Sequence, residues 1–138
     1  MELVPYIMFS GQCEEALNFY AKALDGEIRG LMRYEGSPAE GMSADKEKIL
    51  HASLIAKGIT IMASDGDGAS KDGGMVHLSC DFSDADEQEA VFNALSEGGK
   101  ITMPLENTFW GARFGMLTDK FGIHWMFNLD LPKNEAKK

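Results

Sequence analysis

The hydrophobic pattern of the chain alternates between a strand period and a helix period, and the same succession occurs twice. Residues 3–9 form a short apolar run that predicts a strand, and residues 13–24 carry Ala16, Leu17 and Tyr20 on one face of a predicted helix. Three further strands are predicted in this half, at residues 27–35, 48–56 and 59–64. The first half therefore predicts the order β-α-β-β-β.

The second half of the chain repeats that order. Residues 75–82 predict a strand, and residues 84–97 predict a helix that ends at Gly98 and Gly99. Three strands follow, at residues 100–106, 112–118 and 123–130. The two halves are separated by residues 65–74 (DGDGASKDGG), whose glycines and charges indicate a linker.

Local sequence similarity supports an internal duplication of this β-α-β-β-β unit. Residues 58–62 (GITIM) resemble residues 122–126 (GIHWM). We expect one domain over residues 1–138, with a first module at about 3–64 and a second at about 75–130. Each module alone would expose one face of a four-stranded sheet, so we expect the two modules to pair.

The composition argues against two classes of partner and indicates the cell compartment. The formal net charge is −9 and the sequence pI is about 4.7, so binding to nucleic acid or to an anionic membrane would be opposed by repulsion. No apolar run reaches the roughly 20 residues that span a bilayer, and the first residues lack the basic segment of a signal peptide. We therefore expect a cytoplasmic protein in which Cys13 and Cys80 are reduced thiols.

The two ends of the chain resemble a known superfamily. Residues 5–28 (PYIMFSGQCEEALNFYAKALDGEI) resemble the first strand and helix of the vicinal oxygen chelate superfamily, which includes glyoxalase I, bleomycin-resistance proteins and extradiol dioxygenases. Residues 109–130 (FWGARFGMLTDKFGIHWMFNLD) resemble its PhnB-like branch, often labelled 3-demethylubiquinone 3-methyltransferase-like. The resemblance implies an α+β fold in which two tandem βαβββ modules form a glyoxalase-like curved sheet around a cup.

The resemblance also implies where the superfamily holds its metal. The four ligand positions fall on Pro5, Met62, Met75 and Met126, none of which offers oxygen or nitrogen to a hard divalent cation. We therefore expect no metal and no cofactor, and methionines that fill an apolar cup. A copper site built from the three methionines is the alternative. The methyltransferase label lacks support from the residues, because the Gly-rich strand–turn–helix fingerprint of a nucleotide-binding domain is missing.

Strand alternation predicts which side chains line that cup. The inner face is expected to include Pro5, Ile7 and Phe9 on the first strand, Thr60 and Ser64 beside Met62, His77 and Ser79 beside Met75, and His124 and Asn128 beside Met126. Arg113, paired with Glu106 at the mouth, could hold a carboxylate or phosphonate, or the pair could be a surface salt bridge. Phe109 is expected in the core, whereas Trp110 could belong to the core or the pocket wall. The predicted ligand-binding residues are Met62, Met75, His77, Trp110, Arg113, His124 and Met126.

These residues leave two functions open. The first is a module that binds a small, partly apolar ligand without the usual metal. The alternative is a metal-dependent lyase, isomerase or dioxygenase that uses non-standard ligands such as His51, His77 or Glu106. The simpler interpretation is that the histidines are individually hydrogen-bonded. The sequence does not decide between binding and catalysis, and it assigns no catalytic residue. In either case we expect a homodimer, because sheet edges and exposed aromatic surface favour association.

Overall fold

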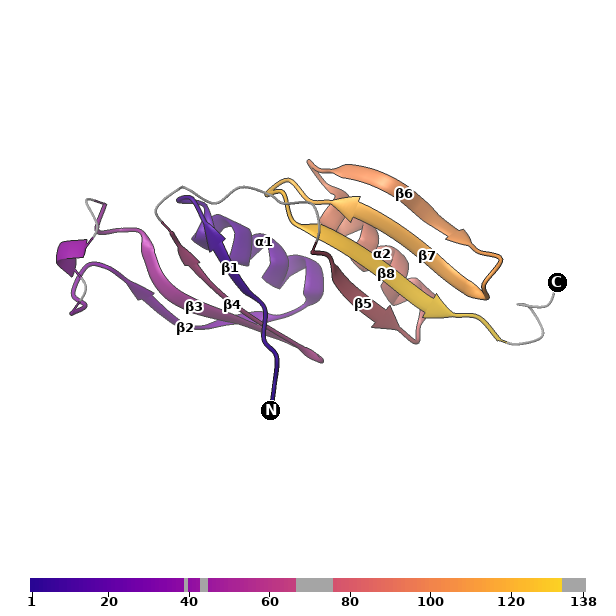
Figure 1. Ribbon diagram of the computed structural model, residues 1–138, viewed down its shortest axis with the longest axis horizontal. Helices are drawn as coiled ribbons and strands as arrows, with labels where there is room; N and C mark the ends of the chain where they lie inside the picture. Colours follow the sequence, from indigo (N-terminus) through magenta and orange to yellow (C-terminus); the bar gives the residue numbers. More distant parts are fainter. Residues whose placement is uncertain (39, 43–44, 67–75, 133–138) are drawn as a thin grey trace. The chain divides into compact units, whose positions relative to one another are not determined.

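The computed structural model describes residues 1–38, 40–42, 45–66 and 76–132. The chain divides into two compact units, Met1–Lys71 and Asp72–Lys138, which we call module 1 and module 2. Each module is a four-stranded sheet with one helix against it (Figure 1). Most of the predicted linker at residues 65–74 lies outside the described residues, and so does Met75.

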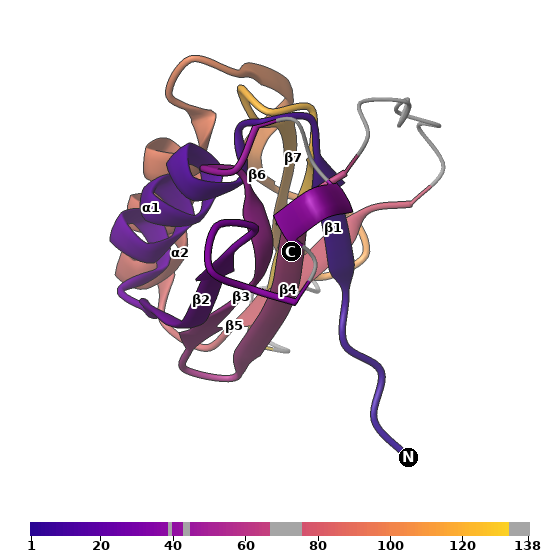
Figure 2. The ribbon, with the colours of Figure 1, turned by 90° about the vertical axis from the view of Figure 1, so that its left-hand side faces the viewer.

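Module 1 follows the predicted order of elements. Its elements are β1 (Tyr6–Phe9), α1 (Cys13–Leu24), β2 (Glu27–Arg33), the short 3-10 helix η1 (Glu40–Met42), β3 (Ile49–Ala56) and β4 (Ile59–Asp65). The strand order is β1-β4-β3-β2, in which β1 runs parallel to β4 and the other pairs are antiparallel. Figure 2 shows α1 against one face of this sheet.

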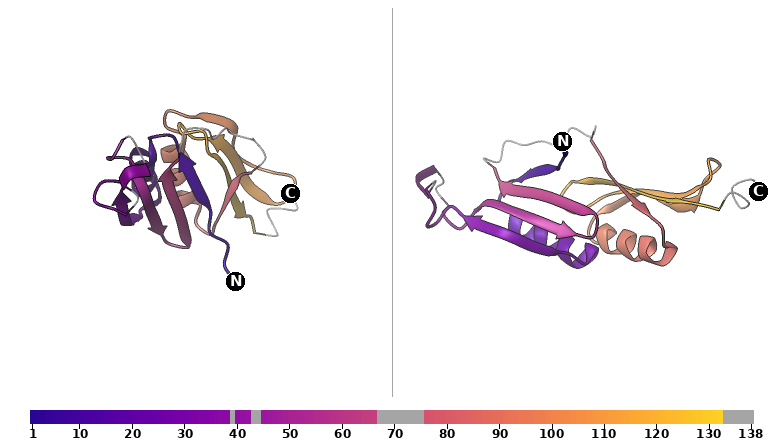
Figure 3. Two further views of the ribbon diagram at one scale, coloured as in Figure 1. Left: turned by 60° about the vertical axis from the view of Figure 1, so that its left-hand side comes forward. Right: turned by 90° about the horizontal axis from the view of Figure 1, so that it is seen from below.

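Module 2 repeats the same topology. Its elements are β5 (Leu78–Phe82), α2 (Ala85–Ser96), β6 (Lys100–Asn107), β7 (Ala112–Thr118) and β8 (His124–Asp130). The order β5-β8-β7-β6, with β5 parallel to β8, matches module 1 strand for strand. The right-hand view of Figure 3 shows each helix on one side of its own sheet. The predicted α+β fold of two βαβββ modules is confirmed.

Each helix packs an apolar stripe onto its sheet. In module 1 the fully buried helix residues Leu17 and Tyr20 share the core with Leu54 of β3. In module 2 Leu95 of α2 and Trp125 of β8 are almost completely buried. Burial of side chains of this size contributes roughly 1.5–3 kcal/mol each, so these two cores account for much of the stability.

A buried aspartate ties three segments of module 1 together. Asp65, at the end of β4, accepts hydrogen bonds from the backbone N–H groups of Gly11 and Cys13 through Oδ1, both at 2.9 Å. Its Oδ2 accepts a third from Ile49 N, also at 2.9 Å. One carboxylate therefore satisfies the first amide of α1, the turn before it and the start of β3.

Glycine allows close backbone contact at the helix-to-strand junction of both modules. A Cβ atom on Gly26 would lie 2.7 Å from the carbonyl oxygen of Ile55, and one on Gly99 would lie 2.4 Å from that of Thr118. No side chain fits at either position without moving backbone. The predicted end of α1 is confirmed, since Asp25 adopts a left-handed conformation with φ 55°.

Strand β6 forms one edge of the sheet of module 2. Its pairing with β7 shifts register twice, between Ile101 and Met103 and between Met103 and Glu106. Pro104 lies inside the second shift, where a residue without an N–H group interrupts no regular ladder. Within the described part of the chain no helix has the length and apolarity needed to cross a membrane.

Candidate functional site

The sheet of module 2 presents one face to α2 and the other face away from it. The cross-strand pairs Leu117–Trp125 and Gly115–Phe127 face the helix. We call the opposite side the helix-distal face of module 2. Its members include the polar and apolar residues His77, Ser79, Phe114, Met116, Thr118, His124, Met126 and Asn128, and the carboxylates Asp81, Glu106 and Asp130.

Two predicted ligand-binding histidines meet on this face. The ring centroids of His77 and His124 lie 4.9 Å apart with 30° between the ring planes. The Nδ1 atom of His124 lies 2.8 Å from the hydroxyl oxygen of Thr118, its cross-strand partner. This hydrogen bond fixes the orientation of the His124 ring. The structure therefore brings together two imidazoles that are 47 positions apart in the sequence (124 minus 77).

Methionines form the apolar part of the same face. Met126 of β8 is paired with Met116 of β7 and with Ser79 of β5. Both methionine side chains are half-buried. Flexible thioether side chains adapt to ligands of irregular shape, so this part of the face suits an apolar group. Met116 was not among the predicted binding residues, although its alternation with Leu117 in β7 contained the signal.

The turn between β6 and β7 carries an exposed aromatic group. The Trp110 ring packs edge-to-face against Phe109 and Phe114, with centroids 5.1 Å and 5.8 Å away. Phe109 is 93% exposed and Trp110 is 53% exposed. The prediction that Phe109 belongs to the core is wrong, because Phe109 occupies a corner of the turn rather than a strand position.

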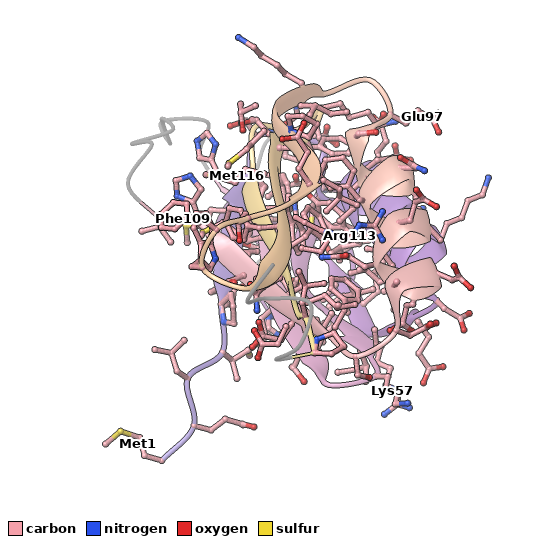
Figure 4. The ribbon with its side chains drawn as sticks, turned by 90° about the vertical axis from the view of Figure 1, so that its right-hand side faces the viewer. Met1, Lys57, Glu97, Phe109, Arg113 and Met116 are labelled. Atoms are coloured by element: carbon pink, nitrogen blue, oxygen red, sulfur yellow. The ribbon has the colours of Figure 1, made fainter. Side chains whose placement is uncertain are left out.

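Arg113 lies on the opposite side of the sheet from this aromatic group. Its guanidinium donates to the carbonyl oxygen of Ala85 and pairs with Glu89 at 3.3 Å, both on α2. Figure 4 shows Arg113 beside the helix, whereas Phe109 and Met116 lie away from it. The predicted pair of Arg113 with Glu106 is therefore wrong. Strand alternation places Arg113 on the same face as Gly115, which packs under α2.

The corresponding face of module 1 carries Met62 and a tyrosine–histidine pair. Met62 of β4 is the cross-strand partner of Tyr6 and of Ser53. The hydroxyl oxygen of Tyr6 lies 3.1 Å from Nδ1 of His51. Tyr6 is 46% exposed, so this pair is open to solvent.

The predicted orientation of the first strand is inverted. Phe9 is buried on the side of α1, and alternation places Ile7 with it. Tyr6 and Met8 instead share the face of Met62. The backbone of Pro5 still lies beside β4, since its carbonyl oxygen accepts a hydrogen bond of 2.9 Å from Met62 N. The cup that the two modules are predicted to share stays a prediction.

The cysteine thiols lie in environments that suppress their reactivity. Burial, together with the nearby carboxylates of Asp65 and Glu14, raises the pKa of Cys13 from 9.0 to about 12. Burial, with Asp81 beside it, raises the pKa of Cys80 from 9.0 to about 11. A nucleophilic cysteine requires a lowered pKa. Neither thiol therefore has the electrostatics of a catalytic nucleophile.

The charged pair Arg33–Glu14 joins β2 to α1 rather than forming a site. Arg33 donates from both terminal nitrogens to the Glu14 carboxylate, at 3.1 Å and 2.8 Å. The hydrogen bond with Arg33 lowers the pKa of Glu14. Because both side chains are partly exposed, the pair contributes little to stability.

The described residues do not fit the metal that the superfamily uses. Pro5 has no donor atom in its side chain, and the sulfur atoms of Met62 and Met126 are soft donors. Among the residues that the structure describes, there is no group of three or more His, Cys, Asp or Glu side chains that could hold a metal ion. The fourth implied position, Met75, lies outside those residues.

The repeated modules define the class of this protein. It is an α+β protein with the glyoxalase-like fold, built from two tandem βαβββ modules. The family profile described as 3-demethylubiquinone-9 3-methyltransferase matches residues 1–127, and the chain belongs to that PhnB-like family.

Several relatives resemble the chain over nearly its full length. Protein YjdN from Escherichia coli is 33% identical, over 94% of this chain and 95% of its own. The crystal structure of protein PA1353 from Pseudomonas aeruginosa is 40% identical, with a TM-score of 0.83 and coverage of 96% and 99%. A PhnB protein from Bacillus cereus is 29% identical, with a TM-score of 0.79 and coverage of 94% and 99%.

A more distant structure shares the fold alone. The fosfomycin resistance protein FosX from Listeria monocytogenes, solved with Mn(II), is 9% identical with a TM-score of 0.63, over 100% of this chain and 98% of its own.

The sheets of this chain differ from the nucleotide-binding fold that the methyltransferase in the family description would suggest. A doubly wound nucleotide-binding domain needs a mostly parallel sheet, whereas each sheet here has one parallel and two antiparallel pairings.

Proposed function

We propose that this protein binds a small, partly apolar organic molecule on the helix-distal faces of its sheets, without a metal at the superfamily's ligand positions. The observation that carries the proposal is the composition of the helix-distal face of module 2. Paired methionines and aromatic rings supply apolar surface, and His77, His124 and Thr118 supply a few hydrogen-bonding groups. Mostly apolar surface with a few polar groups is typical of small-molecule sites.

Module 1 contributes the same combination of side chains. Met62 lies between Tyr6 and Ser53 across neighbouring strands, and Tyr6 is hydrogen-bonded to His51. Of the residues predicted from the sequence, Met62, His77, Trp110, His124 and Met126 support the proposal. Arg113 does not, because its guanidinium is engaged by α2.

A ligand screen with one matched pair of variants tests this function. Thermal-shift measurements against a panel of metabolites and antibiotics, in buffer with EDTA, are followed by calorimetric titration of each hit. We expect Met126→Ser to weaken binding at least about fivefold, since a buried apolar contact is lost. Ile101→Ser is the control, because Ile101 is paired with Leu117 on the opposite face. The absence of any hit, or equal losses in both variants, would contradict the proposal.

A metal-dependent lyase, isomerase or dioxygenase is the second candidate function. It is favoured by one observation, the 4.9 Å approach of the His77 and His124 rings. Two imidazoles are fewer than the three protein ligands of typical catalytic sites, so further donors would be required. Elemental analysis of untagged protein decides between the candidates. About one equivalent of Zn, Ni, Mn or Fe per chain, lost in His124→Gln, would replace the first proposal with this one.

We also propose that the protein is a cytoplasmic homodimer. Phe109 and Trp110 expose apolar surface at the β6–β7 turn of module 2, which favours association. Size-exclusion chromatography with light scattering measures the mass directly. A mass at the 15.1 kDa of one chain would contradict the dimer.

A further inference from the structure

The turn that carries Phe109 and Trp110 is held rigid by its own backbone. Gly111 N donates to the carbonyl oxygen of Thr108 at 3.3 Å, and Thr108 N donates to that of Ala112 at 2.8 Å. Leu131 N, which follows β8, donates to the carbonyl oxygen of Gly111 at 2.9 Å. The backbone that carries these two large aromatic side chains is therefore well bonded, which lowers the entropic cost of binding something to them.

The three rings of this turn stand at steep angles to one another. Trp110 makes 88° with Phe109 and 68° with Phe114. Their faces consequently point in different directions, and Phe109 and Trp110 remain mostly exposed. The face of an aromatic ring carries partial negative charge, so rings arranged in this way attract a cation rather than an anion.

Negative charge lies on the same side of the sheet as these rings. Glu106 is the cross-strand partner of Phe114, and directly opposed residues have Cβ atoms about 5 Å apart. Glu106 forms no ion pair with any residue in the described part of the chain. Asp130, paired with Ala112 at the end of β8, adds a second carboxylate on that side.

Among the residues that the structure describes, the arginine of module 2 is directed away from this turn. Arg113, which is the nearest arginine along the strand, extends to the other side of the sheet and pairs with Glu89. The chain as a whole has a net charge of −9. The charges of the described residues around the turn therefore complement a positively charged ligand.

We propose that Phe109, Trp110 and Phe114, together with Glu106, form a subsite for an organic cation of the quaternary ammonium or methylated amine class. The methyl groups of such a cation would contact the ring faces, and Glu106 would neutralise its charge. The inference rests on the proposed function in one respect, because the cation would be one end of the molecule that the helix-distal face binds.

The test compares choline with 3,3-dimethylbutan-1-ol, in which carbon replaces the ammonium nitrogen and the shape is unchanged. Binding is followed by calorimetry and by the indole N–H signal of Trp110, which is distinguished from that of Trp125 with Trp110→Phe. We expect choline to bind at least about fivefold more tightly than the neutral alcohol, and to shift the Trp110 signal. Equal binding of the two compounds, or no binding of choline, overturns the inference.

Two substitutions of equal charge locate the subsite. Glu106→Gln is expected to weaken choline binding about threefold or more while leaving the neutral alcohol unaffected. Glu97→Gln, at the exposed end of α2 (Figure 4), is expected to change neither. Equal effects of both variants overturn the inference, because they would reflect net charge alone.

Failure of the cation subsite can be distinguished from failure of the proposed function. Trp110→Leu is expected to abolish choline binding without changing the circular dichroism spectrum, since Trp110 lies outside the core. If the ligand screen yields only neutral molecules that bind equally well to Trp110→Leu, the cation subsite is overturned and the proposed function stands.

Discussion

The indole Nε1 of Trp125 donates a hydrogen bond of 2.9 Å to Oδ2 of Asp119, and both side chains are buried. Oδ1 of the same carboxylate accepts from the backbone N–H groups of Phe121 and Ile123, at 2.8 Å and 3.1 Å. One acidic side chain therefore organises the turn between β7 and β8 and positions the largest core residue of module 2.

Removing this carboxylate is expected to destabilise the protein strongly. Asp119→Ala leaves three N–H groups without their acceptor in or near the core, and we expect the free energy of unfolding to fall by about 3 kcal/mol. Urea denaturation followed by tryptophan fluorescence measures the change. Asp81→Ala, at an exposed position in β5, is the control and should stay within about 0.5 kcal/mol. Similar losses in both variants would contradict this account of Asp119.

The buried thiol of Cys13 predicts a loss of stability in alkali. Its pKa is raised to about 12 in the folded protein, whereas the thiol of an unfolded chain titrates near its ordinary value of 9.0. The unfolded state therefore loses its proton first, and folding stability decreases as the pH rises through the window between these two values. Cys13→Ala should flatten this decrease, as measured by urea denaturation between pH 8 and pH 10.5. An unchanged slope would contradict the raised pKa.

Glycine is required at the two equivalent helix-to-strand junctions. Gly99→Ala would place a methyl group 2.4 Å from the carbonyl oxygen of Thr118, and Gly26→Ala would place one 2.7 Å from that of Ile55. We expect each substitution to lower the free energy of unfolding by about 2–3 kcal/mol, since backbone must move. Gly41→Ala, where a Cβ atom would meet nothing within 4 Å, is the control. Thermal denaturation of the three variants makes the comparison, and a loss at Gly41 as large as at Gly99 would count against it.

Double-mutant cycles distinguish the partner that Arg113 has from the one the sequence predicted. The combination of Arg113→Gln with Glu89→Gln should give a coupling energy of about 0.2–1 kcal/mol, because the Glu89 side chain is largely exposed to solvent. The combination of Arg113→Gln with Glu106→Gln should give none. A larger coupling to Glu106 than to Glu89 would mean that Arg113 faces the other side of the sheet.

Hydrophobic periodicity predicts the helices and strands well, but it does not always show which side of a strand faces the helix. The helix at residues 84–97 and the strand at residues 112–118 match α2 and β7 within one residue at each end. In β1, by contrast, both sets of alternating side chains are apolar, so Tyr6 and Met8 could not be separated from Ile7 and Phe9 by hydrophobicity. The burial of Phe9, with Tyr6 and Met8 exposed, settles which side faces α1.

Parts of the site depend on information that a pattern of apolar positions lacks. The sequence prediction puts Phe109 in the core, yet a turn corner directs its side chain into solvent. The orientation of Arg113 was available in principle, since alternation groups it with Gly115 and Leu117. The role of Asp65 could not be predicted because the backbone amides that recognise its carboxylate come from distant segments. Asp119, by contrast, accepts from amides of its own turn, those of Phe121 and Ile123.

The edge strand β6 also has a consequence for aggregation. A continuous row of unpaired N–H groups along a sheet edge is a template on which another chain can add a strand. In β6 the two register shifts bend that row, and Pro104 removes a donor from its interior. The exposed apolar side chains of Ile101 and Met103 can thus be tolerated in solution without turning this border into a starting point for fibril growth.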